Sequence, residues 1–250
     1  MTKNKKLKVA IISLTCCEGC EFALLDLGQR FFTLTEKIDW HNFRLIKEGD
    51  RIDHFDLVFV EGGPTTDSQT KTLQQFRKNS DYLVVLGNCA AMGGIQEIKN
   101  YRDKNVVIKN VYNDIKNIPN QKIVPVGQVV KVDAILPGCP INAEDFLRLI
   151  NNFLVDKKFK IVEKPACYEC QINEFECLLQ KGQPCFGPWT KSGCGAVCLK
   201  SGQPCWGCWG LLKNTDQDHM KKILNEITAS STNDKILQQA EVFGLRDEIE

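Results

Sequence analysis

Thirteen cysteines in a chain of 250 residues constrain this protein more than any other feature of its sequence. Eight of them lie between residues 167 and 208, and the other five are spread over the first 139 residues. An odd number rules out complete disulfide pairing, and clustered cysteines in a reducing compartment usually bind metal. The sequence therefore predicts metal centres held by thiolates.

The amino-terminal sequence favours a cytoplasmic location. A basic start precedes an apolar run over residues 7–14, but this run is short, contains Lys8 and is not followed by a small-residue cleavage site. We interpret it as a buried strand. No stretch approaches the roughly 20 apolar residues of a membrane-spanning helix. A net charge of +1 gives no indication of a nucleic-acid partner.

Residues 7 to about 154 alternate between short apolar runs and amphipathic runs. We predict strands at residues 7–14, 56–61, 82–86 and 132–136. We predict helices at residues 21–32 and 66–78, and a third that begins at the N-cap Asn142. Nearly continuous apolar strands that alternate with helices indicate a parallel sheet covered on both faces. The predicted fold class is α/β, with a flavodoxin-like doubly wound sheet over residues 1–160.

The sequence changes character after this region. Glycine, proline, cysteine and tryptophan dominate residues 164–210, and the hydrophobic periodicity disappears. An apolar core alone cannot stabilise such a segment, so it needs cross-links such as bound metal. We therefore predict a small irregular Cys-rich iron–sulfur domain over residues 161–250. Helical patterns return at 216–227 and 234–243, and we expect these helices to pack on the cysteine-rich segment or to face a partner.

Four of the first five cysteines lie just after predicted strands: Cys17, Cys20, Cys89 and Cys139. Ligands of open α/β sheets bind at the carboxyl ends of the strands, so these four thiolates are expected to converge there. Four thiolates suit a [4Fe–4S] cluster. The competing interpretation makes Cys89 and Cys139 small buried apolar residues. For Cys16 we favour an inert neighbour over a role in tuning the cluster.

The other eight cysteines begin and end with a Cys-x2-Cys pair, and Gly182-Gln-Pro-Cys185 recurs as Gly202-Gln-Pro-Cys205. Grouping neighbours closes the shortest loops. It gives one set of Cys167, Cys170, Cys177 and Cys185, and another of Cys194, Cys198, Cys205 and Cys208. Spacing alone leaves other groupings open. Zinc is a rival ligand for paired Cys-x2-Cys motifs, but it does not explain the cysteines at the sheet edge.

At this point the motifs resemble those of a known family. The matching segments are 14–20, 60–63, 87–94, 138–140, 177–198 and 205–208. They resemble the small subunit of [NiFe] hydrogenases, and most closely the delta-like subunit of the cytoplasmic sulfhydrogenase or NAD(P)-linked (group 3) type. The resemblance covers roughly residues 7 to 210.

The resemblance implies three [4Fe–4S] clusters and assigns their ligands. The proximal cluster takes Cys17, Cys20, Cys89 and Cys139, the medial cluster takes Cys194, Cys198, Cys205 and Cys208, and the distal cluster takes Cys167, Cys170, Cys177 and Cys185. Glu18 and Glu61 are then expected near the proximal cluster, on a proton or partner path. The competing interpretation of Glu61 is a cap for the turn at Gly62 and Gly63.

The resemblance also implies a function. The chain is expected to relay electrons of the reaction H2 ⇌ 2 H⁺ + 2 e⁻ between a nickel–iron site on a large subunit and a flavin and iron–sulfur diaphorase-type partner that uses NAD(P)⁺. It is thus a subunit of an oxidoreductase and holds no catalytic residue itself. One alternative is a zinc-binding structural or interaction module. Another is an electron-transfer subunit of a hydrogenase-derived complex that lacks nickel.

Overall fold

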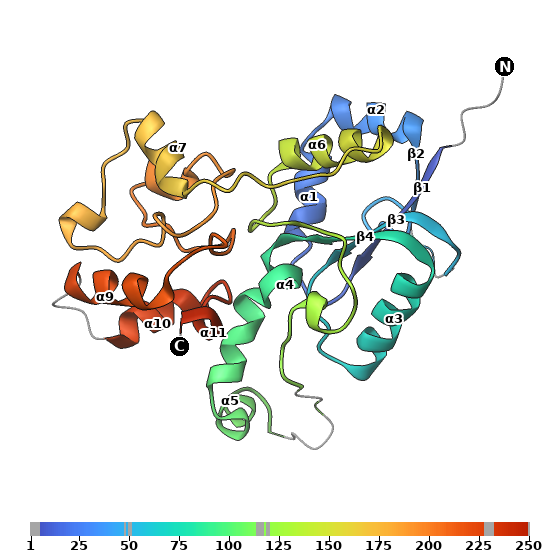
Figure 1. Ribbon diagram of the computed structural model, residues 1–250. Coiled ribbons are helices and arrows are strands. Elements are labelled where there is room, and N and C mark those ends of the chain that lie inside the picture. The colour runs from blue at the N-terminus through green and yellow to red at the C-terminus, as the bar shows by residue number, and fades with distance from the viewer. Residues whose placement is uncertain are drawn as a thin grey trace. The chain divides into compact units, whose positions relative to one another are not determined.

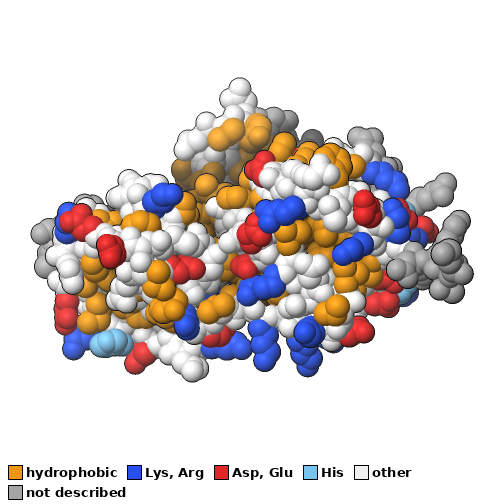
Figure 2. Space-filling model, turned by 90° about the horizontal axis from the view of Figure 1, so that it is seen from above, with side chains coloured by type: hydrophobic (Ala, Val, Ile, Leu, Met, Phe, Trp, Pro, Cys, Tyr) orange, Lys and Arg blue, Asp and Glu red, His pale blue; other side chains and the backbone are white. Residues whose placement is uncertain are grey.

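The computed structural model describes residues 6–47, 49, 52–113, 118, 121–227 and 233–249 (Figure 1). The chain divides into two compact units, Met1–Arg148 and Leu149–Glu250. In the described residues, none of the helices combines the length and the apolar character needed to cross a membrane. Basic and acidic side chains are interspersed with apolar ones over the face shown in Figure 2.

The first unit is built on a five-stranded parallel sheet with the strand order β2-β1-β3-β4-β5. Its strands are β1 (Leu7–Ser13), β2 (Ile38–His41), β3 (Phe55–Glu61), β4 (Ser80–Leu86) and β5 (Ala134–Leu136). In register, Ile11 of β1 lies opposite Phe59 of β3, which lies opposite Val84 of β4. This is the doubly wound order of flavodoxin-like folds, so the predicted fold class is confirmed.

Helices cover both faces of the sheet, which is why the central strands are apolar throughout. Figure 1 shows α2 (Gln29–Lys37) and α6 (Ala143–Leu154) on one side and α3 (Asp67–Lys78) on the other. On β3, Phe59 lies against Phe146 of α6, with ring centroids 5.1 Å apart. Val60 instead joins a buried cluster with Phe76 of α3. Alternate residues of one strand therefore serve two separate apolar layers.

Two of the predicted helix starts are confirmed by side-chain caps. Thr66 precedes α3, and its hydroxyl accepts a hydrogen bond from the backbone N–H of Gln69 at 3.2 Å. Asn142 precedes α6, and its side-chain oxygen accepts one from the backbone N–H of Glu144 at 2.9 Å. Such caps satisfy N–H groups that have no partner within the helix.

The prediction of one helix over residues 21–32 is wrong. The segment forms α1 (Gly19–Leu25) and then α2, which are separated by a turn that ends at Gly28. Gly28, the N-cap of α2, has a φ of +55°, so one continuous right-handed helix cannot run through this position. The short strand β2, which follows α2 directly, was also missed.

Shorter elements complete the first unit. They are α4 (Gly87–Met92), η1 (Gly94–Tyr101), α5 (Lys104–Val111) and η2 (Val126–Gln128). The helix α4 begins at the residue after β4 and contacts both β4 and β5. Its position brings residues 87–92 to the carboxyl edge of the sheet.

The second unit has little regular structure before its last helices. Its elements are α7 (Ala166–Ile172), η3 (Leu179–Lys181), α8 (Val197–Lys200), α9 (Gln217–Ile227), α10 (Asn233–Glu241) and α11 (Arg246–Ile249). Buried Gln239 of α10 donates hydrogen bonds to the carbonyl oxygens of Pro184 at 3.3 Å and of Cys205 at 3.2 Å. The expectation that a carboxyl-terminal helix packs on the cysteine-rich segment is therefore confirmed.

Candidate metal centres

The structure brings the first four predicted ligands together at the carboxyl edge of the sheet. Cys17 and Cys20 follow β1, Cys89 lies in α4 after β4, and Cys139 follows β5. The pKa of the Cys89 thiol is raised to about 11, first by burial and then by the charges of Cys139 and Cys17. Burial also raises the pKa of Cys139, and again Cys17 adds to the effect.

Two glycines leave room for these sulfur atoms. Gly87 has a φ of +76°, and a Cβ atom there would collide with Sγ of Cys20. A Cβ atom at Gly94, where φ is +62°, would lie 3.0 Å from Sγ of Cys89. Because these glycines have no side chain, the backbone can approach the cysteine sulfur atoms closely. We call Gly87 and Gly94 the glycine cradle of the thiols. Cys20 is buried and Cys89 half-buried, and positive iron would relieve the cost of charging four neighbouring thiolates, so this set of thiols fits an iron–sulfur cluster.

Glu61 anchors the helix that carries Cys20. It is 2% exposed, and its two carboxylate oxygens accept hydrogen bonds from the backbone N–H groups of Cys20 and Glu21, each at 3.1 Å. Burial raises the pKa of Glu61, while these two N–H groups oppose the shift. The carboxylate thus caps the first turn of α1. The alternative considered from the sequence was a cap of the turn at Gly62 and Gly63.

The structure places the other two candidates of this region next to the same helix. Glu18 is the N-cap of α1 and has a φ of +61°. Cys16 is half-buried, and burial raises the pKa of its thiol to about 12, with Glu61 as the next cause. Its sulfur lies 4.0 Å from the carbonyl oxygen of Leu14.

Sequence reasoning missed Glu21, which follows Cys20 directly. This carboxyl group is fully buried, and its Oε1 accepts a hydrogen bond from the hydroxyl of Ser13. Burial raises its pKa to about 7, the Ser13 hydroxyl opposes the shift, and the charge of Glu61 adds to it. The only signal in the sequence was an acidic residue beside a Cys-x2-Cys pair.

In the second unit, one predicted set of four cysteines lines a single small cavity. Cys167 and Cys170 lie on α7, and Cys177 and Cys185 lie in the loops that follow. All four line a cavity of about 20 Å³. The pKa of Cys167 is raised to about 12, first by burial and then by the charges of the other three thiols.

Of the remaining four cysteines, Cys198 lies in the short helix α8, Cys194 precedes it, and Cys205 and Cys208 follow it. Burial raises the pKa of Cys194, and its neighbours Glu169 and Cys198 add to the shift. Burial also raises the pKa of Cys205 to about 12, with further contributions from Cys185 and Cys194. Cys208 is half-buried in the turn after Gly207. Cys194 is therefore near Cys198 and Cys205, and Cys205 is also near Cys185 of the other set.

The two repeated Gly-Gln-Pro-Cys loops are hydrogen-bonded to each other. The backbone N–H of Cys205 donates to Sγ of Cys185 at 3.2 Å, and the N–H of Phe186 donates to the carbonyl oxygen of Cys205 at 3.0 Å. Neighbouring cysteine sets therefore touch at one point. In the described ranges, no three or more His, Cys, Asp or Glu side chains form a group that holds a single metal ion.

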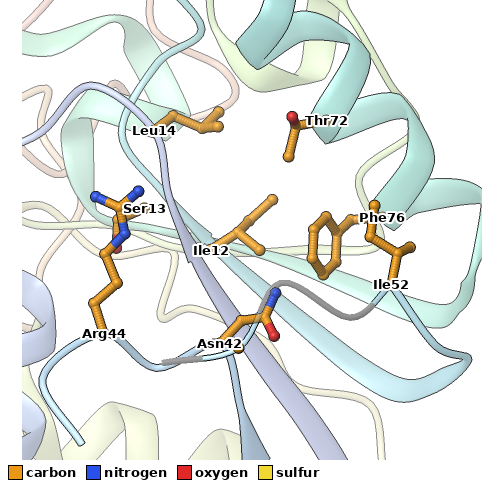
Figure 3. Close-up of a pocket in the computed structure, with 9 residues that line it drawn as sticks. Ile12, Ser13, Leu14, Asn42, Arg44, Ile52, Thr72 and Phe76 are labelled. Carbon is orange, nitrogen blue, oxygen red and sulfur yellow. The ribbon is translucent and has the colours of Figure 1, made fainter. Parts of the chain in front are cut away.

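A separate cavity of about 800 Å³ lies at the carboxyl end of β1. Its lining residues include Ser13, Arg44, Thr72 and Phe76, and none of its lining residues is a cysteine. In Figure 3 the guanidinium group of Arg44 points toward Ser13, and Phe76 of α3 forms part of the opposite wall. This cavity is distinct from the cysteine sets.

Comparison with known proteins defines the class. Residues 17–153 match the family described as NADH ubiquinone oxidoreductase, 20 Kd subunit, and the chain belongs to this family. Sulfhydrogenase 2 subunit delta of Pyrococcus furiosus is 32% identical over 225 residues, which cover 88% of this chain and 93% of that protein. The delta subunit of the NAD-reducing hydrogenase HoxS of Cupriavidus necator is 28% identical over 64% of this chain and 84% of that protein.

A solved structure agrees with these relatives at the level of the fold. A crystal structure of an NAD⁺-reducing [NiFe]-hydrogenase in the H2-reduced state contains a chain that matches with a TM-score of 0.58. The match covers 63% of this chain and 96% of that one, at 24% sequence identity. The resemblance to the delta-like small subunits of [NiFe] hydrogenases, inferred from the motifs, is confirmed.

Proposed function

We propose that this chain is the electron-transfer small subunit of a cytoplasmic [NiFe] hydrogenase and that it holds three [4Fe–4S] clusters. The observation that carries the proposal is the convergence of Cys17, Cys20, Cys89 and Cys139 from three distant segments of the chain. A purely structural role for these cysteines does not require that convergence. Membership of a family whose relatives are hydrogenase subunits supports the same conclusion.

Three sets of four thiolates are proposed as cluster ligands. The proximal set is Cys17, Cys20, Cys89 and Cys139, the medial set is Cys194, Cys198, Cys205 and Cys208, and the distal set is Cys167, Cys170, Cys177 and Cys185. The cavity lined by the whole distal set supports that grouping. The medial grouping is proposed for the four cysteines that remain, of which Cys194 acts on the pKa of Cys205 and Cys198 on that of Cys194.

Iron–sulfur clusters supply one-electron transfer, and the chain's own residues bury and tune them. Burial of Cys20, Cys170, Cys185 and Cys205 excludes water from their sulfur atoms. Backbone N–H groups aimed at the sulfurs favour the reduced cluster, as the N–H of Cys205 does toward Sγ of Cys185. This chain therefore conducts electrons, and the bond of H2 is broken on the large subunit.

Two kinds of partner follow from the proposal. The first is a nickel–iron large subunit, supported by the relatives that are hydrogenase subunits and by the fold match to a chain of an NAD⁺-reducing [NiFe]-hydrogenase. The second is a flavin and iron–sulfur diaphorase-type partner that reduces NAD(P)⁺, supported by the name of the NAD-reducing relative. The chain alone is expected to show no hydrogenase activity.

The test uses the chain purified anaerobically together with its large subunit. Under H2, the visible absorption of the clusters is expected to bleach, and it should recover when an oxidant is added. Replacing one cysteine of each set, as Cys89→Ser, Cys198→Ser or Cys170→Ser, should remove about four iron atoms per chain. Cys16→Ser is the matched control and should retain all of them.

Other outcomes would replace the proposal. Zinc without sulfide in the purified complex would identify a zinc-binding module instead. Clusters that dithionite reduces but H2 does not, in a complex without nickel, would identify a subunit of a hydrogenase-derived complex.

A further inference from the structure

One acidic side chain links the two cysteine-rich sets of the second unit. Glu169 lies on α7 between Cys167 and Cys170, which are proposed ligands of the distal cluster. Its carboxylate nevertheless reaches the loop of the medial set. Oε1 accepts a hydrogen bond from the N–H of Gly193 at 2.9 Å, and Oε2 accepts one from the N–H of Ala196 at 3.3 Å. Oε2 also lies 3.9 Å from Sγ of Cys194.

The loop that this carboxylate holds has an unusual backbone. Gly193, Gly195 and Ala196 have φ values of +136°, +67° and +51°. A Cβ atom at Gly193 would collide with the buried ring of Trp209, so this position admits only glycine. Ala196 has a side chain, and the left-handed conformation is unfavourable for it. Such a conformation persists when surrounding contacts hold the backbone in place. Glu169 supplies two of these contacts, its hydrogen bonds to the N–H groups of Gly193 and Ala196.

The carboxylate also competes with the sulfur for a donor. The backbone N–H groups of Ala196 and Val197 also act on the Cys194 thiol and oppose the rise of its pKa. Because Glu169 accepts from the N–H of Ala196 as well, it draws part of that donor away from the sulfur. A negative charge near a cluster disfavours the added electron, and an N–H bond to a ligand sulfur favours it. Both effects of Glu169 therefore act in the same direction.

We propose that Glu169 is a positioning residue that lowers the reduction potential of the medial cluster and fixes the Cys194 loop against α7. The proposal rests on the proposed function, in which Cys194 is a ligand of that cluster. The medial and distal sets also touch through Cys205 and Cys185. A carboxylate between the sets thus acts on the difference in potential that drives the electron from one to the other.

The test is Glu169→Gln in the complex with the large subunit. The amide has nearly the same shape and keeps one acceptor, but it removes the charge and offers a donor to the Cys194 sulfur. In a redox titration followed by electron paramagnetic resonance, we expect the reduction equilibrium constant of the medial cluster to rise at least about tenfold, an upward shift of about 59 mV for a one-electron couple. The medial signal is the one that Cys198→Ser alters.

A matched control separates this effect from a general change of charge. Glu163→Gln makes the same change at an exposed position of the same unit and should leave all three potentials in place. Glu169→Ala removes the clamp as well as the charge. It should raise the same potential and also speed the loss of iron to a chelator, whereas Glu169→Gln should retain its iron.

Failure of this inference can be told from failure of the proposed function. Full iron content with an unchanged medial potential in Glu169→Gln would overturn the inference alone. A larger shift in the signal altered by Cys170→Ser would also overturn it, because the charge would then act on the distal cluster. A wild-type complex with zinc and no sulfide would instead overturn the proposed function.

Discussion

The two units of this chain assemble their cysteine sets in opposite ways. In the first unit, a parallel sheet with an apolar core carries four cysteines from distant parts of the sequence to one edge. In the second unit, eight cysteines lie within residues 167–208, and the helices among them, in the described residues, have at most seven residues. We therefore expect the sheet to build its site before any metal binds, and the cysteine-rich segment to need the metal to complete its core.

Removal of the clusters should expose this difference most strongly. We expect the apoprotein to keep slow amide exchange in β1, β3 and β4, because their core consists of apolar side chains. Residues 164–210 should lose protection entirely, since a structural metal contributes on the order of 10 kcal/mol to such a fold. Hydrogen exchange on holoprotein and apoprotein measures both. Equal loss of protection in the two units would contradict the comparison.

The next largest effect is expected at the glycine cradle of the sheet edge. Gly87→Ala adds a Cβ atom at a φ of +76° where it collides with Sγ of Cys20, so the proximal site should lose about four iron atoms per chain. The control is Gly28→Ala. Its φ is +55°, but no atom lies within 4 Å of the added Cβ, so it should cost only about 1–2 kcal/mol and retain all iron. Iron content and urea unfolding distinguish the two.

A substitution in the apolar core should act on stability without changing the metal content. Phe59→Ala removes a fully buried ring that lies against Phe146. The free energy of unfolding of the first unit should fall by about 3–5 kcal/mol. Phe32→Ala, at a ring that is 63% exposed, should leave it nearly unchanged. Loss of iron from the second unit in Phe59→Ala would show that the units do not fold independently.

The smallest effect is expected at the cap of α3. Thr66→Ala removes the hydroxyl that accepts from the N–H of Gln69, and it should lower the free energy of unfolding by about 1 kcal/mol. Thr33→Ala is the control, because that exposed hydroxyl bonds only a carbonyl of its own helix. Denaturant titration of both variants measures the difference. Equal values would mean that the cap contributes nothing to this unit.

The sequence predicts the first unit well because its signals are local. Long apolar runs identify β1, β3 and β4, and caps at Thr66 and Asn142 locate two helix starts. The strand β2 has only four residues, so its alternation was too short to recognise. Gly28 was not recognised as a break because glycine is tolerated within helical patterns.

The sequence predicts less of the second unit, for a physical reason. Its elements are held by contacts between side chains and distant backbone groups, which leave no periodic pattern. Glu169 reaches a residue 24 positions away, and Gln239 reaches the carbonyl of Cys205 across 34 positions. The cysteines themselves could be identified, but their grouping depends on these contacts.

The central claim is that both units hold clusters of the same kind. Iron, acid-labile sulfide and zinc measured on anaerobically purified protein test it most directly. We predict about twelve iron and twelve sulfide per chain, the content of three [4Fe–4S] clusters, with no stoichiometric zinc. About four of each would contradict the claim, because only the sheet edge would then hold a cluster, and zinc without sulfide would contradict it for both units.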